Sequence, residues 1–144
     1  MNNKSFNTFN RDILITQKKE HNIMAEEEMS KQLQDQINRL QQMRMQLQMI
    51  MQQRQQVELR LKEIGEALEE LDKTDEKTPI YKSVGAILIK TKGRGEVTKE
   101  LKSNKESLEL RKSTLEKQEG RTKEKLNEIQ SKVQNALNVS GSSN

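Results

Sequence analysis

The chain has no cysteine, no tryptophan, one proline and one histidine in 144 residues. Without cysteine it can form neither a disulfide framework nor a thiolate, and a cytoplasmic location is the default expectation. No apolar run approaches the roughly 18 residues of a membrane span. The run Ile13-Leu14-Ile15 is also too short for the apolar region of a signal peptide. We therefore expect no membrane partner.

Residues that could carry catalysis are equally scarce. The single histidine, His21, lies in a stretch without periodicity, where a solvated side chain is expected in place of a metal ligand. The sequence contains no nucleophile-elbow motif and no spacing typical of metal ligands. Gly93-Arg94-Gly95 lacks the third glycine and the following lysine of a phosphate-binding loop. The sequence predicts a protein that is not an enzyme and that uses no cofactor and no metal.

Charge is abundant but evenly mixed. Lysine and arginine number 26 against 22 acidic residues, and 33% of the chain is charged. A phosphate-binding face gathers cations on one stripe, usually with aromatics, and no such stripe is present. We expect no nucleic-acid partner. With 31% hydrophobic and 2% aromatic residues, the composition favours long solvated helices over a globule with a central core.

Two long segments carry a heptad repeat with apolar residues at positions a and d. In the first, the a positions are Leu33, Leu40, Leu47, Arg54, Leu61 and Leu68, and the d positions are Gln36, Met43, Ile50, Val57, Ile64 and Leu71. In the second, the d positions are Leu101, Leu108, Leu115, Thr122, Ile129 and Ala136, and the a positions are Lys105, Lys112, Glu119, Leu126 and Val133. Folded back near Gly85, the chain pairs a with d throughout, so the repeat predicts an antiparallel coiled-coil hairpin.

The stretch between the repeats resembles two short strands. Pro79 ends the helical pattern, and the residues on both sides of Gly85 are rich in Ile, Val and Leu. The predicted fold is mainly α, with helices over about 30–72 and 98–138, a β-hairpin over about 79–91, and N-caps at Ser30 and Thr98. Residues 139–144 are expected to be a disordered tail.

Residues 1–24 stand apart from this domain, which we place at 25–138. They hold both phenylalanines, Phe6 and Phe9, and no sustained period. Two interpretations remain open: a disordered extension, or upstream sequence that is absent from the mature protein.

The β-hairpin predicts association. An isolated two-stranded hairpin is marginal in water, and Ile87-Leu88-Ile89 is apolar on both faces. Hairpins from several chains could close one another's edges into a barrel-like oligomer body. The alternative is that the hairpin packs on the ends of its own helices.

Toward the far end of the helices, apolar residues exceed what the seam requires. Met45, Met49 and Met51 lie at f, c and e, and Ile37 and Leu137 lie at e. Together with Met43, Leu47 and Ile50 they form a soft apolar surface, and methionine is favoured where a binding surface must adapt. The alternatives are that the methionines are tolerated helix formers or pack against another copy.

Several stretches resemble the prefoldin β subunit, in particular its archaeal form. They are Tyr81-Lys82-Ser83-Val84-Gly85-Ala86-Ile87-Leu88-Ile89-Lys90, Leu68-Glu69-Glu70-Leu71 before it, and Leu108-Glu109-Leu110-Arg111-Lys112-Ser113-Thr114-Leu115-Glu116-Lys117-Gln118-Glu119 after it. The similarity covers about residues 25–138. The motif Tyr-Lys-x-x-Gly followed by apolar residues is its most specific part.

The resemblance implies a hexamer of two α and four β subunits, whose β-hairpins form a double barrel from which six coiled coils extend. It implies an ATP-independent holdase that captures unfolded polypeptides at the coiled-coil tips and passes them to a group II chaperonin. Assembly residues would be Tyr81, Val84, Gly85, Ile87 and Ile89. Client-binding tip residues would be Ile37, Met43, Met45, Leu47, Met49, Ile50 and Met51, facing Ile129, Val133 and Leu137. A structural coiled-coil adaptor for one folded partner is the competing interpretation.

Overall fold

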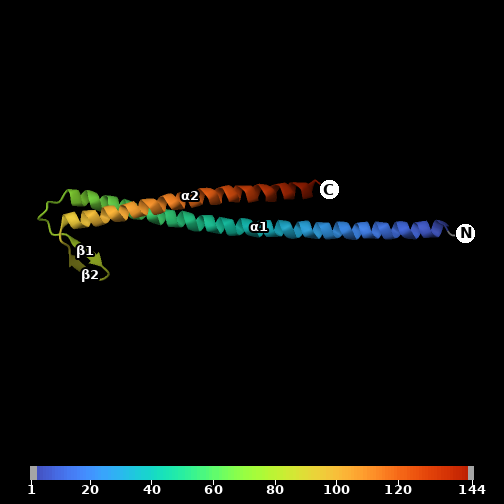
Figure 1. Ribbon diagram of the computed structural model, residues 1–144, viewed down its shortest axis with the longest axis horizontal. Helices are drawn as coiled ribbons and strands as arrows, with labels where there is room; N and C mark the ends of the chain where they lie inside the picture. The colour runs from blue at the N-terminus through green and yellow to red at the C-terminus, as the bar shows by residue number, and fades with distance from the viewer. Residues whose placement is uncertain (1–2, 143–144) are drawn as a thin grey trace. The chain divides into compact units, whose positions relative to one another are not determined.

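The computed structural model describes residues 3–142, with side chains described from Ser5 onward. The chain runs through helix α1 (Asn3–Asp72), strand β1 (Tyr81–Val84), strand β2 (Ile87–Lys90) and helix α2 (Arg94–Gly141) (Figure 1). It divides into two compact units, which are described separately. The hairpin unit is Met45–Glu124, and the terminal unit combines residues 1–44 with residues 125–144. The mainly α fold with a short β-hairpin is confirmed.

The hairpin unit is held together by a narrow seam between α1 and α2. Ile50, Val57 and Leu115 form its buried cluster, and the half-buried Leu61 and Leu108 pack against that cluster. Leu61 and Leu108 are an a–d pair in the register that the sequence predicts for antiparallel helices. The antiparallel pairing is therefore confirmed in this unit.

Burial follows the heptads in both units. Every residue predicted at an a or d position from Leu33 to Ala136 is buried or half-buried. In the terminal unit the buried positions are Leu40 of α1 and Val133 of α2, whereas residues 5–32 are exposed without exception. The seam therefore begins at Leu33, where the heptad pattern begins.

A capped turn ends α1 close to the predicted residue. The Asp75 carboxylate accepts hydrogen bonds from the backbone N–H of Lys77 at 2.8 Å and of Thr78 at 2.9 Å. Together with a hydrogen bond from the Thr78 hydroxyl, these bonds lower the pKa of Asp75. Since each bond favours the ionised carboxylate, Asp75 fixes the turn that leads into Pro79.

The two strands pair antiparallel, with Tyr81 opposite Lys90 and Val84 opposite Ile87. Gly85 takes the first central position of the two-residue turn with φ of 58°, a left-handed conformation that glycine adopts without steric cost. The turn at Gly85 is where the sequence predicts it. Thr91 closes the open end of the hairpin, because both its backbone N–H and its hydroxyl donate to the Ile80 carbonyl at 2.9 Å.

Helix α2 begins at Arg94, four residues before the predicted start, so the N-cap expected at Thr98 is wrong. The Glu96 carboxylate accepts the backbone N–H of Lys92 at 2.9 Å, and the Thr91 hydroxyl accepts that of Gly93 at 3.2 Å. These side chains supply the start of the helix with acceptors. Thr98 lies one turn inside α2, where its hydroxyl is buried without a hydrogen-bond partner among the described residues.

Helix α1 begins far earlier than the sequence predicts, at Asn3 instead of about residue 30. The predicted N-cap at Ser30 lies inside the helix, and the disorder expected for the segment up to residue 24 is not seen from Asn3 onward. The physical reason is that no proline and no glycine occurs before Gly65, so no strong helix breaker interrupts α1. Whether residues 1–23 remain in the mature protein stays a prediction.

At the other end, α2 continues to Gly141, three residues past the predicted end. The disorder expected for the tail from residue 139 is therefore not seen up to Gly141. Residues 143 and 144 of the expected tail, like residues 1 and 2 of the expected extension, lie outside the described residues.

Leu115→Ala should destabilise the fold by about 2–5 kcal/mol, the usual cost of emptying a packed leucine site. Leu115 is 4% exposed at the centre of the buried cluster. The matched control is Leu110→Ala, five residues earlier on the outer face of the same helix, where the side chain is 72% exposed. Urea unfolding at equal subunit concentration measures both, and equal losses for the two variants would contradict the seam.

Candidate functional site: two exposed apolar surfaces

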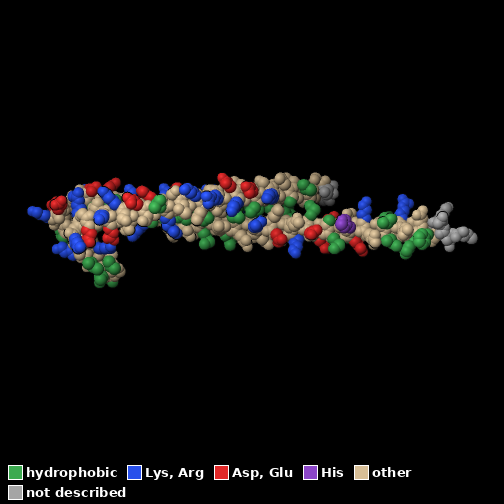
Figure 2. All heavy atoms as spheres, in the orientation of Figure 1, with side chains coloured by type: hydrophobic (Ala, Val, Ile, Leu, Met, Phe, Trp, Pro, Cys, Tyr) green, Lys and Arg blue, Asp and Glu red, His purple; other side chains and the backbone are tan. Residues whose placement is uncertain are grey.

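The β-hairpin presents apolar side chains with nothing over them. Every residue from Tyr81 to Lys90 is exposed, including all its large apolar side chains. Figure 2 shows hydrophobic side chains gathered on this hairpin. The alternative in which the hairpin packs on its own helix ends is therefore wrong for this chain. The hairpin is an apolar surface that lacks a cover.

The register divides these side chains between two faces. Val84 pairs with Ile87, and Lys82 pairs with Ile89, so the predicted assembly residues Val84, Ile87 and Ile89 share one face. Tyr81 lies on the opposite face, with Ser83, Leu88 and Lys90.

Leu88 was missed among the predicted assembly residues. It is 73% exposed, more than any other large hydrophobic side chain that the structure describes. The signal was present in the sequence, because in the continuous run Ile87-Leu88-Ile89 the middle residue must face away from its neighbours. Both faces of the hairpin therefore carry apolar groups.

An ion pair ties the hairpin to the start of α2. The Lys82 ammonium of β1 contacts the Glu100 carboxylate, and the Arg94 guanidinium donates to the Thr74 carbonyl in the turn after α1. Both contacts lie within the hairpin unit and join segments that are distant in sequence. The Lys82–Glu100 pair joins the apolar hairpin to α2, and the Arg94–Thr74 bond joins the turn after α1 to the start of α2.

The predicted tip residues of the hairpin unit fall into two groups. Met45 and Met49 are exposed at 63% and 60%. Leu47 and Met51 are half-buried, and Ile50 is buried in the seam as a d residue. Met45 and Met49 thus lie on the outer face of α1, while Ile50 faces the partner helix and supports it.

In the terminal unit the predicted tip residues divide in the same way. Leu137 is exposed, Ile37, Met43 and Ile129 are half-buried, and Val133 is buried opposite α1. The residues that a partner could contact directly are therefore those at outer heptad positions. The role of all ten residues in client binding stays a prediction.

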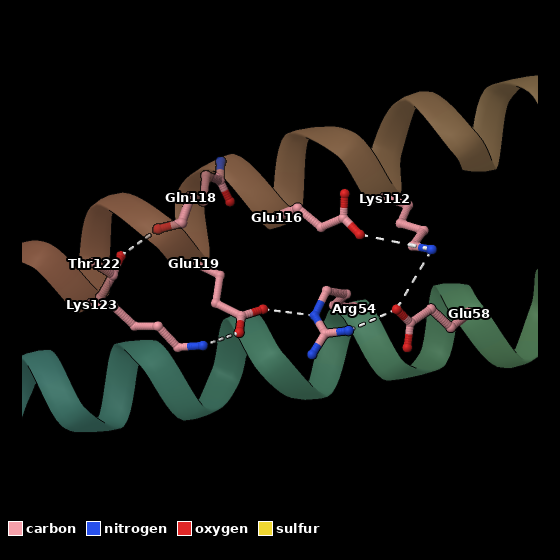
Figure 3. Close-up of polar contacts among 8 residues, drawn as sticks. All are labelled: Arg54, Glu58, Lys112, Glu116, Gln118, Glu119, Thr122 and Lys123. Carbon is pink, nitrogen blue, oxygen red and sulfur yellow. Dashed lines mark hydrogen bonds and ion pairs between the residues drawn. The ribbon is translucent and has the colours of Figure 1, made fainter.

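A charged layer interrupts the apolar seam of the hairpin unit (Figure 3). Arg54 of α1 donates from Nε to Glu119 Oε2 of α2 at 2.6 Å, and from Nη1 to Glu58 Oε1 at 2.7 Å. Lys123 also donates to Glu119, at 2.6 Å. Thr122 occupies a buried d position, and its hydroxyl donates a hydrogen bond to the Gln118 carbonyl at 2.8 Å.

The hydrogen bonds of this layer favour the charged forms of Glu119 and Arg54 within the seam. Hydrogen bonds from Lys123 and Arg54 lower the pKa of Glu119, although its burial acts in the opposite direction. The same pairing with Glu119 and Glu58 raises the pKa of Arg54. A buried charge without its partner is costly, so the layer disfavours any shift of α2 along α1.

Other kinds of site are not found in the part of the chain that the structure describes. From residue 3 to residue 142, no group of three or more His, Cys, Asp or Glu side chains could hold a metal ion. Among the same residues, no helix is long and apolar enough to span a bilayer.

Two long helices joined by an exposed β-hairpin place the chain in the class of helical coiled-coil hairpin proteins. The family model for the prefoldin subunit matches residues 34–139 of this chain. The chain therefore belongs to the prefoldin subunit family, a family of molecular chaperones.

Individual relatives agree. Prefoldin subunit beta of Archaeoglobus fulgidus is 46% identical over 110 residues, which cover 76% of this chain and 94% of the relative. That of Thermoplasma volcanium is 37% identical over 115 residues, covering 80% and 93%. The crystal structure of the prefoldin beta subunit from Thermococcus strain KS-1 matches with a TM-score of 0.66 and 38% identity, over 74% of this chain and 92% of that one. The resemblance to the archaeal β subunit is confirmed.

Family membership gives the exposed hairpin its context. Prefoldin subunits assemble with one another into oligomers, so this chain is a subunit of a chaperone and is not complete alone. Its uncovered apolar strands are what such an assembly requires.

Stability should fall on acidification as Glu119 becomes protonated. Because the folded-state pKa of Glu119 is lowered, its contribution is present above the ordinary glutamate pKa and is lost as the pH falls through the folded-state value. Urea unfolding between pH 7 and pH 3 should show a smaller decline for Glu119→Gln than for the unsubstituted chain. Glu116→Gln, at the exposed carboxylate paired with Lys112, is the control and should keep the full decline. Identical pH profiles for both variants would exclude this role for Glu119.

Proposed function

We propose that this chain acts in an ATP-independent holdase that captures non-native polypeptides on the exposed apolar residues of its helices and delivers them to a group II chaperonin. Its partners would be an α subunit and further β subunits, in a hetero-hexamer of two α and four β chains. The site of action would be the cytoplasm.

One observation supports client capture above all. Met45 and Met49 are exposed on a helix whose seam is already filled by Leu47 and Ile50, so the fold of this unit does not need them. Methionine side chains are unbranched and polarizable, and they adapt to irregular apolar partners. Neighbouring glutamines, such as Gln46 and Gln48, keep this helix face hydrated without adding charge. Such a surface suits clients of many sequences.

The affinity of one such face would be low, and the assembly compensates for this. When several subunits contact the same polypeptide, the first contact raises the effective concentration of the client at the others. Binding and release then need no nucleotide. A hexamer therefore achieves by valency what a single helix face cannot.

The hairpin would supply the assembly. Unpaired backbone groups at the edges of β1 and β2 can extend a sheet into the hairpin of a neighbouring subunit, and the apolar faces would then be buried in a barrel. The side chains proposed for this interface are those of Tyr81, Val84, Ile87 and Ile89. Leu88 is included as well because it is highly exposed. Gly85 would shape the turn.

Replacing Met45 and Met49 together by glutamine should weaken client binding about tenfold, through loss of apolar contact area. The probe is reduced and carboxymethylated α-lactalbumin, which cannot fold, and its binding is measured with the complex reconstituted with an α subunit. Leu59→Gln with Leu110→Gln is the matched control, since both leucines are about as exposed but lie outside the proposed surface. Unchanged binding by the methionine variant would reject the proposed site. Binding of one folded protein and no denatured one would favour the adaptor interpretation.

Ile87→Asp should dissociate the oligomer, because an apolar interface cannot take an unpaired carboxylate cheaply. The control is Ile87→Val, which keeps the apolar face and should keep the assembly. Native mass spectrometry of each variant with the α subunit measures the outcome. A hexamer that forms equally well with Ile87→Asp would count against the hairpin as the interface.

A further inference from the structure

The first 27 described residues of α1, here called the N-terminal segment (residues 3–29), carry the longest stretch of uncovered apolar side chains. All residues from Ser5 to Met29 are exposed. The large apolar ones are Phe6, Phe9, Ile13, Leu14, Ile15, Ile23, Met24 and Met29. Figure 2 shows them as hydrophobic patches along the end of α1. Both phenylalanines of the chain are among them, at 71% and 65% exposure.

Helix α2 does not cover this segment. It ends at Gly141, which the register of the seam places opposite about residue 28. Within the terminal unit, α1 therefore continues past the end of its partner helix (Figure 1). The segment also precedes residue 34, where the match to the prefoldin subunit family begins. Its apolar residues serve neither the seam nor the shared family fold.

A second copy of the segment is a poor partner. Phe6, Phe9 and Ile13 begin a heptad stripe, but its next positions are Thr16 and Glu20. Pairing two copies along this stripe would bury these polar groups after a single apolar repeat.

A rigid helical partner of another kind does not fit either. Leu14 and Ile15 follow Ile13 directly, and successive residues point about 100° apart around a helix. The apolar groups therefore lie on several sides of α1, more than one straight helix can cover. A flexible chain can contact several sides at once. The pattern favours an extended polypeptide with apolar side chains as the occupant.

The segment also continues an apolar surface of the same unit. Leu137 of α2 is exposed, and the register places it opposite about residue 32, one turn from Met29. From Leu137 through Met29 and Met24 to Phe9, exposed apolar side chains thus follow one another along the terminal unit. A client held at Leu137 has further apolar contacts within reach.

We propose that the N-terminal segment is an additional client-binding element that takes non-native polypeptide segments bearing aromatic and aliphatic side chains. This inference rests on the proposed holdase function and extends its binding surface. The two phenylalanines supply large apolar area at low entropic cost, and the remaining aliphatic residues let the client bind in several orientations.

The test compares Phe6→Gln with Phe9→Gln, made together, against the matched control Asn7→Gln with Asn10→Gln on the same two turns. The probe is again reduced and carboxymethylated α-lactalbumin, with the complex reconstituted from the full chain and an α subunit. The phenylalanine variant should bind about tenfold more weakly. The asparagine variant should bind as the unsubstituted chain does. A chain that begins at Met24 should lose at least as much as the phenylalanine variant.

Three results would overturn this inference, and they are distinguishable from failure of the proposed function. The first is full binding by the chain that begins at Met24 while the Met45 and Met49 variant binds weakly, which leaves the holdase function intact. The second is cross-linking from position 9 to the same segment of another subunit in the absence of client. The third is an intact mass, from the natural source, of a chain that begins at Met24. Unchanged binding by all variants would reject both proposals.

Discussion

The structure depends on one narrow seam between two antiparallel helices. Ile50, Val57 and Leu115 are its centre, and no large side chain among the described residues is completely removed from water. Two helices in contact can bury only one stripe of each, so most of the surface of both helices remains in solvent. Among the described residues the buried side chains follow this seam, and many large apolar side chains outside it are exposed.

The same constraint explains the charged layer. If the seam were apolar throughout, it would tolerate a shift of one helix along the other by a heptad. Arg54 and Glu119 form a hydrogen-bonded ion pair across the seam, and Lys123 also donates to Glu119. A shifted register would separate Arg54 from Glu119 and leave a charge in the seam without its partner. The charged layer reduces the apolar contact area between α1 and α2, but it defines the register in which the two helices pair. A defined pairing matters here because the position of the β-hairpin at the turn follows from it.

Outside the seam, the chain leaves apolar groups of two different kinds uncovered. The hairpin combines unpaired backbone edges with branched side chains, which suits a fixed partner of similar geometry. The helices instead present methionines and, in the N-terminal segment, apolar residues on several sides of α1, which suits partners without fixed geometry. The chemistry of the exposed residues thus distinguishes the surface proposed for assembly from the surface proposed for varied clients.

Much of this was predictable from local patterns. The a and d positions, the antiparallel register and the turn at Gly85 follow from residue spacing, because a heptad repeat and a two-residue turn are properties of short stretches of chain. The resemblance to prefoldin was also carried by a short motif around the turn. The boundaries were less predictable. Helix α2 begins at Arg94, just after Lys92 and Gly93, whose backbone N–H groups donate to Glu96 and Thr91. Helix α1 begins at Asn3 because no proline or glycine before Gly65 breaks it.

The sequence by itself determined where the chain doubles back and which stripe of each helix is apolar, since periodicity needs no knowledge of the partner. Only the tertiary structure decided which apolar residues are covered. Ile50 and Val133 are buried although they were grouped with Met45 and Leu137, and Leu88 proves to be the most exposed of the large hydrophobic residues in the hairpin. The physical reason is that burial is set by the opposing helix or strand, and the opposing element is specified by the fold and not by neighbouring residues.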